Sequence, residues 1–297
     1  MTTLSSTQKN HFKSIVARHP LTSMYIGAFI LAWAYFIPKV LYSLGLFPFA
    51  MPDVFGLLAG WTPAIAAAIV TGAIDGWKGV KQLFSRYLIW RVSGWWYVFV
   101  LVFFVPIILS AAGLHVWFGG EMPQIGAFNM QWWEVLPSFL VQVLLLMLLN
   151  GEEVAWRGFA LPRLQAQYNN LVVAALLVAI PETLLHAPGF FLKDDPFISS
   201  VGVIPFILFS VALSVIYAWT FSRTKGSVLL VALFHAAQNS WGNLLTDNTA
   251  RLFHITVVLL WVVAIALILF TKGRQSKPVE IPESPSQDFW EIFPAES

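Results

Sequence analysis

Long apolar segments constrain the fold of this chain more than any other feature. A helix needs about 20 mostly apolar residues to cross a bilayer. Of the 297 residues, 58% are hydrophobic and only 11% are charged, whereas a soluble domain has about 25% charged residues. We predict an all-α polytopic membrane protein with about eight transmembrane helices, at 23–45, 51–74, 95–117, 133–166, 170–190, 202–222, 227–246 and 252–271.

The polar parts of the chain complete this layout. Segment 78–92 mixes basic and apolar residues and predicts an amphipathic helix on the membrane surface. We expect residues 1–22 to form a cytoplasmic N-terminal segment and 23–272 the transmembrane domain, with the first span kept as an uncleaved signal anchor. The tail 273–297 is rich in proline, serine and acidic residues, which predicts a disordered cytoplasmic tail.

The basic residues predict the orientation. Cytoplasmic loops of membrane proteins carry an excess of Lys and Arg. Of the 17 Lys and Arg residues, the predicted spans leave only Lys39, Lys193 and Arg251 on the outer side and the other 14 on the inner side. We therefore expect a multi-pass protein of the cell (cytoplasmic) membrane with both termini in the cytoplasm.

Several chemistries are excluded or unsupported. The chain has no cysteine, so disulfides, thiolate metal sites and a cysteine nucleophile are excluded. The net charge of +2 is too small to suggest binding to nucleic acid. The sequence also lacks a Gly-x-Ser-x-Gly elbow, a His-Glu-x-x-His pair, an internal repeat and a phosphate-binding glycine loop.

Ionisable residues inside the apolar segments call for an explanation, because each costs several kcal/mol at membrane depth unless it is paired or faces a cavity. Glu153 and Arg157 are four residues apart, which predicts an ion pair on one helix face. Glu152 points about 100° away and has no local partner. The alternative is that all three cap the cytoplasmic end of the fourth span.

Spacing predicts that Glu152 meets His186. Each lies 17 residues from Asn169, in the expected turn between the fourth and fifth spans. In an antiparallel hairpin both would reach one depth, roughly 25 Å of helix from the turn. A glutamate and a histidine at that level form an acid/base or metal pair, although a lone His186 would more often be a packing residue.

His235 and Asn239 are also four apart and share a face of the seventh span. Interhelical hydrogen bonding is an equally common use of such residues in membrane helices. Glu and His can deprotonate a water, while a second His and an Asn can donate to an oxyanion. Glu152, His186 and His235 could instead hold zinc with water in the open position. The residues leave the metal-bound and metal-free versions open.

Three motifs carry a resemblance to a known family. They run from Gly151 to Gln165 (GEEVAWRGFALPRLQ), from His186 to Phe191 (HAPGFF) and from Leu233 to Asn239 (LFHAAQN). In this order and spacing they resemble the CAAX prenyl protease 2-like family, also called CPBP intramembrane proteases. That family includes the eukaryotic Ras-converting endoprotease and bacterial bacteriocin-processing or immunity proteins. The resemblance covers roughly 133–245.

The resemblance implies a role for each matching residue. Glu152 would be the general base that activates water, aided by His186, while His235 and Asn239 would hold the oxyanion or contribute to a metal site. Glu153 and Arg157 would be supporting partners. The substrate would be a membrane-associated peptide or protein, cut near the cytoplasmic face in the best-understood members. Glu182 stands where the family usually has an aromatic residue, and it could orient the His186 ring or add a ligand.

The leading hypothesis is therefore an intramembrane endopeptidase, metalloendopeptidase-like or metal-free, in a prokaryotic cytoplasmic membrane. A rival from another class is a catalytically inactive membrane immunity or binding protein that uses the same cavity. A proton-carrying transporter is a third hypothesis, although the chain lacks the internal repeat that many carriers show.

Overall fold

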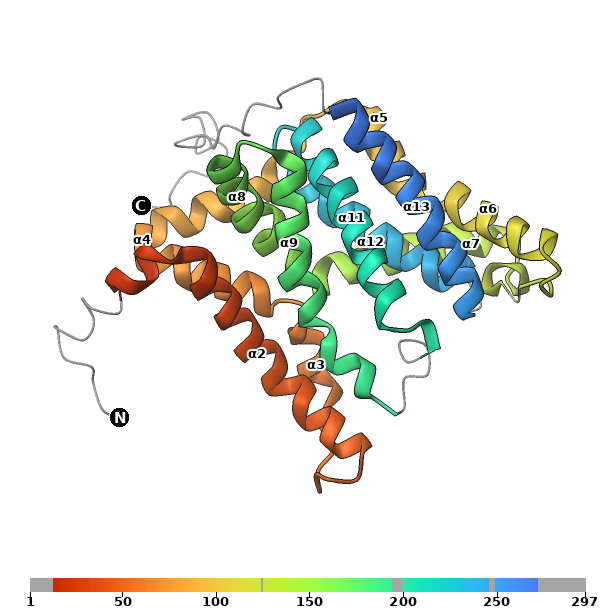
Figure 1. Ribbon diagram of the computed structural model, residues 1–297, viewed down its shortest axis with the longest axis horizontal. Helices are drawn as coiled ribbons and strands as arrows, with labels where there is room; N and C mark the ends of the chain where they lie inside the picture. Colours follow the sequence, from red (N-terminus) through yellow and green to blue (C-terminus); the bar gives the residue numbers. More distant parts are fainter. Residues whose placement is uncertain (1–12, 124, 194–199, 246–248, 272–297) are drawn as a thin grey trace.

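The computed structural model describes residues 13–123, 125–193, 200–245 and 249–271. All regular structure in these residues is helical, which confirms an all-α fold (Figure 1). The terminal parts of the predicted domain layout, 1–12 and 272–297, lie outside the described residues, so the disordered tail stays a prediction.

The helices follow one another along the chain with short connections. Their bounds are α2 (Pro20–Ser43), α3 (Asp53–Ala59), α4 (Thr62–Ser85), η1 (Arg86–Leu88), α5 (Gly94–Val102), α6 (Phe104–Trp117), η2 (Gly126–Asn129), α7 (Trp132–Leu149), η3 (Val154–Ala160), α8 (Leu161–Tyr168), α9 (Leu171–Leu185), η4 (Ala187–Phe191), α11 (Val203–Arg223), α12 (Val228–Leu245) and α13 (Ala250–Thr271).

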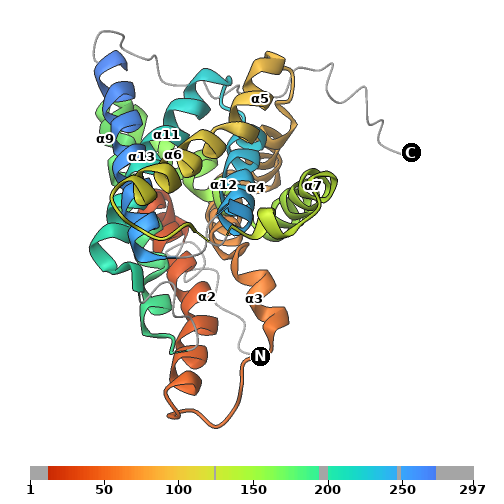
Figure 2. The same ribbon diagram turned by 90° about the vertical axis from the view of Figure 1, so that its right-hand side faces the viewer.

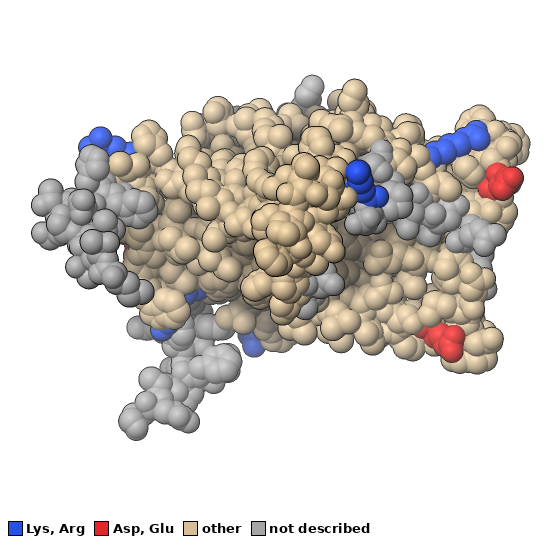
Figure 3. All heavy atoms as spheres, turned by 90° about the horizontal axis from the view of Figure 1, so that it is seen from below, with Lys and Arg blue, Asp and Glu red and all other residues tan. Residues whose placement is uncertain are grey.

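Six of the described helical stretches are long and apolar enough to cross a membrane. They are Pro20–Ser43, Gly94–Trp117, Trp132–Leu149, Leu171–Phe191, Val203–Arg223 and Ala250–Phe270. Many large apolar side chains on them are exposed, and the face in Figure 3 carries few charged residues, as expected for a surface in contact with lipid. A polytopic membrane protein is thus confirmed.

The counterparts of the other two expected spans, α4 and α12, are not among these six. The second half of α4 carries Lys78 and Lys81, and α12 carries His235 and Asn239. α12 lies inside the bundle against α5, α6, α7 and α11 (Figures 1 and 2). A helix surrounded by protein can hold polar residues that lipid would not accept. The number eight stays a prediction.

The expected continuous helix 133–166 is wrong. α7 ends at Leu149, Asn150 is extended, and a new helical stretch starts at Glu152 with the π-helix η3 before α8. The Asn150 side chain accepts a hydrogen bond from the Glu152 N–H at 2.8 Å, a local turn that competes with helix continuation. The break puts Glu152 at a helix start rather than in the middle of a span.

A second break holds the first one in place. Gly60 and Trp61 separate α3 from α4, so the expected span 51–74 is also interrupted. The Gly151 N–H donates to the Gly60 carbonyl at 3.0 Å, and Trp61 Nε1 donates to the Leu148 carbonyl at 2.8 Å. A Cβ on Gly151 would overlap the Trp61 ring. Glycine is therefore required where the two breaks meet.

The predicted amphipathic helix 78–92 is the second half of α4 followed by η1. Gly76, at φ 66°, bends α4 in a conformation open mainly to glycine. Beyond the bend Lys78 and Lys81 are exposed while Leu83 is buried, which is the amphipathic pattern expected. Arg86 departs from it, since its side chain is buried over the Phe221 ring.

Candidate functional site

A cavity of about 450 Å³ lies among α6, α9, α11, α12 and α13 and the break before η3. Four residues singled out from the sequence line it: Glu152, His186, His235 and Asn239. Glu182 lines it too, whereas Arg157 is fully buried behind the wall. The structure thus brings these residues from three separate helical segments to one cavity.

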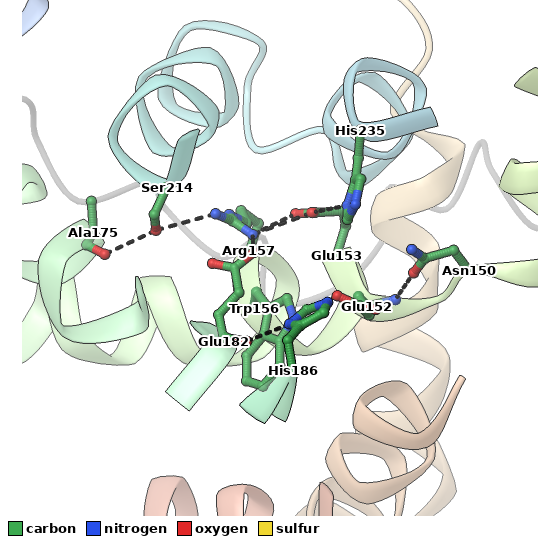
Figure 4. Close-up of polar contacts among 10 residues, drawn as sticks. All are labelled: Asn150, Glu152, Glu153, Trp156, Arg157, Ala175, Glu182, His186, Ser214 and His235. Atoms are coloured by element: carbon green, nitrogen blue, oxygen red, sulfur yellow. Dashed lines mark hydrogen bonds and ion pairs between the residues drawn. The ribbon is translucent and has the colours of Figure 1, made fainter. Parts of the chain in front are cut away.

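Glu152 has a partner that the sequence did not suggest. Trp156 Nε1 donates to Glu152 Oε2 at 3.3 Å, so the buried indole holds one carboxylate oxygen. The wide turn of the π-helix places these side chains together, and π-helical turns often occur at functional sites. Figure 4 shows the Glu152 carboxylate and the His186 ring pointing toward one another.

His186 has a fixed hydrogen-bonding pattern. It is the residue after α9, and its Nδ1 lies 2.9 Å from the Glu182 carbonyl oxygen. Because a carbonyl oxygen only accepts, Nδ1 carries the hydrogen and donates. In the neutral ring this leaves Nε2 as an acceptor. The ring can therefore take a proton at Nε2, next to the carboxylate of Glu152.

Behind the cavity, a chain of charged groups leads to His235. The predicted Glu153–Arg157 ion pair is present, with Arg157 Nη1 3.1 Å from Glu153 Oε2. Glu153 Oε1 accepts from His235 Nδ1 at 2.9 Å, which links the pair to α12 (Figure 4). An ionised carboxylate only accepts, so this bond keeps the hydrogen of His235 on Nδ1. Because the hydrogen of the neutral ring is on Nδ1, the Nε2 atom of His235 can donate only when the ring is protonated. The adjacent Glu153 carboxylate stabilises that imidazolium.

The side chain of Glu182 does not bond to the His186 ring, contrary to one expectation from the sequence. Its Oε1 accepts from Arg157 Nη1 at 2.5 Å, and Arg157 Nη2 donates to Ser214 Oγ at 3.1 Å. Ser214 in turn donates to the Ala175 carbonyl at 2.9 Å. Glu182 orients His186 through its backbone carbonyl instead. Its carboxylate is a second counter-ion for Arg157.

Several residues of the site escaped the sequence reasoning. Ser214 bonds Arg157, and the Tyr217 ring lies 5.1 Å from the Arg157 guanidinium. Both are on α11, and their signal was a polar group in an otherwise apolar helix. Trp156 gave no such signal, because its contact with Glu152 depends on the π-helix.

The zinc alternative finds no ligand group in this arrangement. Among the described residues, no three His, Asp or Glu side chains converge closely enough to hold a metal ion. In His186 and His235 the Nδ1 atom is bonded to a protein group, which leaves Nε2 of each ring as the nitrogen that could bind a metal. We therefore derive no step through a metal, and zinc bound by Glu152, His186 and His235 stays a prediction of the sequence.

Comparisons with known proteins agree with the motifs. Residues 130–241 match the protein family described as Rce1-like, type II CAAX prenyl endopeptidase Rce1-like. The resemblance to the CAAX prenyl protease 2-like family is confirmed. The Rce1-like segment contains Glu152, His186, His235 and Asn239, and with them Glu153, Arg157 and Glu182.

A curated relative shows the same resemblance. Over 185 residues the chain is 30% identical to CAAX prenyl protease 2 of Methanococcus maripaludis. That match covers 58% of this chain and 65% of the relative. The chain thus spans somewhat less than two thirds of the relative's length.

Proposed function

We propose that this protein is an intramembrane endopeptidase that hydrolyses a peptide bond of a membrane-associated peptide or protein. One observation carries the proposal: the Glu152 carboxylate and the His186 ring point toward one another at the wall of a cavity that also presents His235 and Asn239 (Figure 4). The similarity to a CAAX prenyl protease supports the reaction class. We place the protein in the cell membrane with cytoplasmic termini, on the grounds of its basic residues.

In this proposal Glu152 is the general base. Its carboxylate takes a proton from a water molecule held against His186, and the resulting hydroxide attacks the carbonyl carbon of the scissile bond. His186 can hold the second hydrogen of that water at Nε2, since its Nδ1 is committed to the Glu182 carbonyl. The protonated Glu152 then returns that proton to the leaving amine as the C–N bond breaks, so protons balance without a covalent intermediate.

His235 and Asn239 stabilise the developing negative charge. Both lie on one face of α12 and line the same cavity as Glu152 and His186. The Asn239 amide donates whatever its surroundings, and His235 donates from Nε2 when protonated, a state that Glu153 favours. Donors placed in advance around an oxyanion are worth about 10²–10³-fold in rate each.

Cleavage of a defined peptide mixture tests the proposal. The purified protein in detergent micelles is incubated with proteome-derived apolar peptides, and new termini are identified by mass spectrometry. We expect cleavage by the wild type that Glu152→Gln and His186→Ala abolish, while Glu121→Gln, at an exposed carboxylate that does not line the cavity, leaves it unchanged. Peptides that bind the folded protein without being cut would favour the immunity or binding alternative.

A further inference from the structure

Arg86, on η1, is a buried cation outside the candidate site. Its side chain is only 6% exposed, and its guanidinium carbon lies 5.6 Å from the centre of the Phe221 ring. No hydrogen bond or ion pair reaches this guanidinium from the described part of the chain, whereas Arg157 is paired with two carboxylates. Because a buried charge is costly unless it is paired, Arg86 calls for a partner that the described residues do not supply.

The guanidinium of Arg86 is not sealed inside the protein. Among the described residues, the enclosed side-chain atoms that lack a hydrogen-bond partner include Nε of Arg157 but no nitrogen of Arg86. Since the nitrogens of Arg86 have no partner there either, each keeps a narrow contact with the outside. A guanidinium in this position can donate outward in the forked geometry that matches an oxyanion.

A second arginine lies close to the first. Burial, together with the charge of Arg163 on α8, lowers the pKa of Arg86 to about 10. The guanidinium carbon of Arg163 lies 3.7 Å from the centre of the Phe159 ring, and Nη1 donates to the Phe159 carbonyl at 2.9 Å. Asp75 attracts Arg163, but the two form no ion pair. Two guanidinium charges against this one carboxylate leave a net charge of +1.

The start of α12 adds a third source of positive potential. Ser227 caps this helix, since its Oγ accepts from the Leu230 N–H at 3.2 Å. The same hydroxyl donates to the Ile89 carbonyl at 2.7 Å, which holds the start of α12 next to η1. The N-terminus of such a helix carries roughly half a positive charge and attracts anions. The helix start and Arg86 therefore favour the same kind of ligand.

The chain on both sides of Arg86 has the composition of a membrane interface. Trp77 and Trp90 are exposed, and so are the basic side chains of Lys78 and Arg91. Exposed tryptophan beside basic residues is typical of the level of the lipid headgroups. The anion that every phospholipid carries at this level is phosphate, which arginine binds through two parallel hydrogen bonds.

We propose that Arg86 and Arg163 bind a phosphate group at the membrane surface, carried by an anionic phospholipid headgroup or present as free phosphate. Arg86 donates to the phosphate oxygens and gains the counter-ion that the described residues do not provide. Arg163 supplies a second charge from α8, and the start of α12 adds its dipole. Neither arginine lines the candidate cavity, so the inference goes beyond the proposed function and does not depend on peptide cleavage.

Ligand-induced stabilisation tests the site in the full-length protein purified in detergent. The protein is titrated with dioleoyl phosphatidylglycerol, dioleoyl phosphatidylcholine or inorganic phosphate. Dissociation constants follow from the rise in melting temperature, because a ligand that binds only the folded state stabilises it. Arg86→Met removes an unpaired buried charge but keeps an apolar stem over Phe221, so we expect this variant to fold. Arg91→Met is the matched control, at an exposed arginine of the same segment. Arg163→Met tests the site independently if Arg86→Met does not fold.

We expect phosphatidylglycerol to bind the wild type and Arg91→Met equally well, and phosphatidylcholine, whose choline neutralises its phosphate, to bind more weakly. In Arg86→Met and Arg163→Met the dissociation constant of phosphatidylglycerol should rise by about tenfold, the loss expected for a charge-assisted hydrogen bond. Stabilisation by phosphatidylglycerol alone identifies the headgroup as the source of the phosphate. Stabilisation by inorganic phosphate that Arg86→Met abolishes identifies the free anion.

Two results would overturn the proposal. One is an equal dissociation constant of phosphatidylglycerol or phosphate for the wild type and for the folded arginine variants, because binding would then not involve these guanidinium groups. The other is a wild-type protein whose melting temperature responds to neither ligand. Both readouts are independent of cleavage, so they leave the proposed protease activity untouched.

Discussion

Arg157 Nη1 lies 2.5 Å from Glu182 Oε1, although the two residues are 25 positions apart in the chain. The same nitrogen lies 3.1 Å from Glu153 Oε2, so one guanidinium joins the π-helix to α9 and, through Glu153 and His235, to α12. Three elements that carry the candidate site therefore depend on one fully buried cation.

Removing that cation should unfold the site. Arg157→Ala leaves the carboxylates of Glu153 and Glu182 buried without a counter-ion, and breaking a buried ion pair in this way costs about 3–5 kcal/mol. We expect a large fall in the melting temperature, which is measured by tryptophan fluorescence in detergent. Arg223→Ala removes an exposed arginine and should leave the melting temperature unchanged. Equal melting temperatures for both variants would refute the role of Arg157.

The coupling between Arg157 and Glu182 can be measured separately. In a double-mutant cycle, the combined Arg157→Ala and Glu182→Ala protein should be less destabilised than the sum of the single variants, by about 0.5–3 kcal/mol. The reason is that the double variant buries one fewer unpaired charge. Unfolding free energies from denaturant titration in mixed micelles give the coupling. Strict additivity would show that the two groups do not interact.

A second buried arginine should behave in the opposite way. Arg86 is buried over the Phe221 ring, and no ion pair to it occurs among the described residues. Burial, together with the nearby charge of Arg163, lowers the pKa of Arg86 to about 10. Since the charged form gains no carboxylate to offset its desolvation, Arg86→Met should leave the melting temperature unchanged or raise it. A loss as large as that of Arg157→Ala would contradict this reading.

The sequence predicts which side chains lie together at the site better than it predicts the path of the backbone there. The four-residue spacing of Glu153 and Arg157 and of His235 and Asn239 survives in the structure because both pairs lie within single helical stretches. The break at Asn150 could not be foreseen, since the apolar pattern continues through it. The contact that requires it, between Gly151 and Trp61, joins residues 90 positions apart.

Glu182 illustrates a second limit. Its spacing from His186 correctly indicates a shared helix face, but spacing does not tell which atom of Glu182 the ring meets. The carboxylate turns to Arg157 because it forms a hydrogen bond with a buried guanidinium in which both partners are charged, and the backbone carbonyl is left for His186.

The junction of the two helix breaks should be sensitive to one methyl group. Gly151→Ala places a Cβ against the Trp61 ring, which forces the start of η3 to shift and moves Glu152 with it. We expect lower stability, by about 1–3 kcal/mol for overpacking, and slower cleavage. Gly113→Ala on α6 meets open space and is the matched control, with unchanged or slightly higher stability. A cleavage rate of Gly151→Ala equal to that of the wild type would argue against the claim that Glu152 must be held in one position.

The oxyanion donors should act on the chemical step. Asn239→Ala and His235→Ala are each expected to lower kcat by about 10²–10³-fold with little change in KM, since their hydrogen bonds strengthen as negative charge develops. Steady-state kinetics on a peptide found in the cleavage screen measures both parameters. A rise in KM at constant kcat would instead assign these residues to substrate binding.

The response to chelators separates the two versions of water activation. With Glu152 and His186 acting alone, 1,10-phenanthroline and EDTA should leave the cleavage rate unchanged, and purified protein should carry no stoichiometric zinc. The metal-bound version would be favoured by about one zinc per chain that is lost, together with activity, in a Glu152→Gln/His186→Ala variant. In the wild type, added zinc would then restore the activity that the chelators remove.

The most direct test of the central claim is the single-turnover cleavage rate of Glu152→Gln, measured with enzyme in excess over a peptide that the wild type cuts. The substitution keeps the size of the side chain and the acceptor for Trp156 but removes the base. The account predicts unchanged peptide binding and a rate lower by about 10²–10⁴-fold, the range that a positioned general base contributes. A rate within a few-fold of the wild type would contradict it.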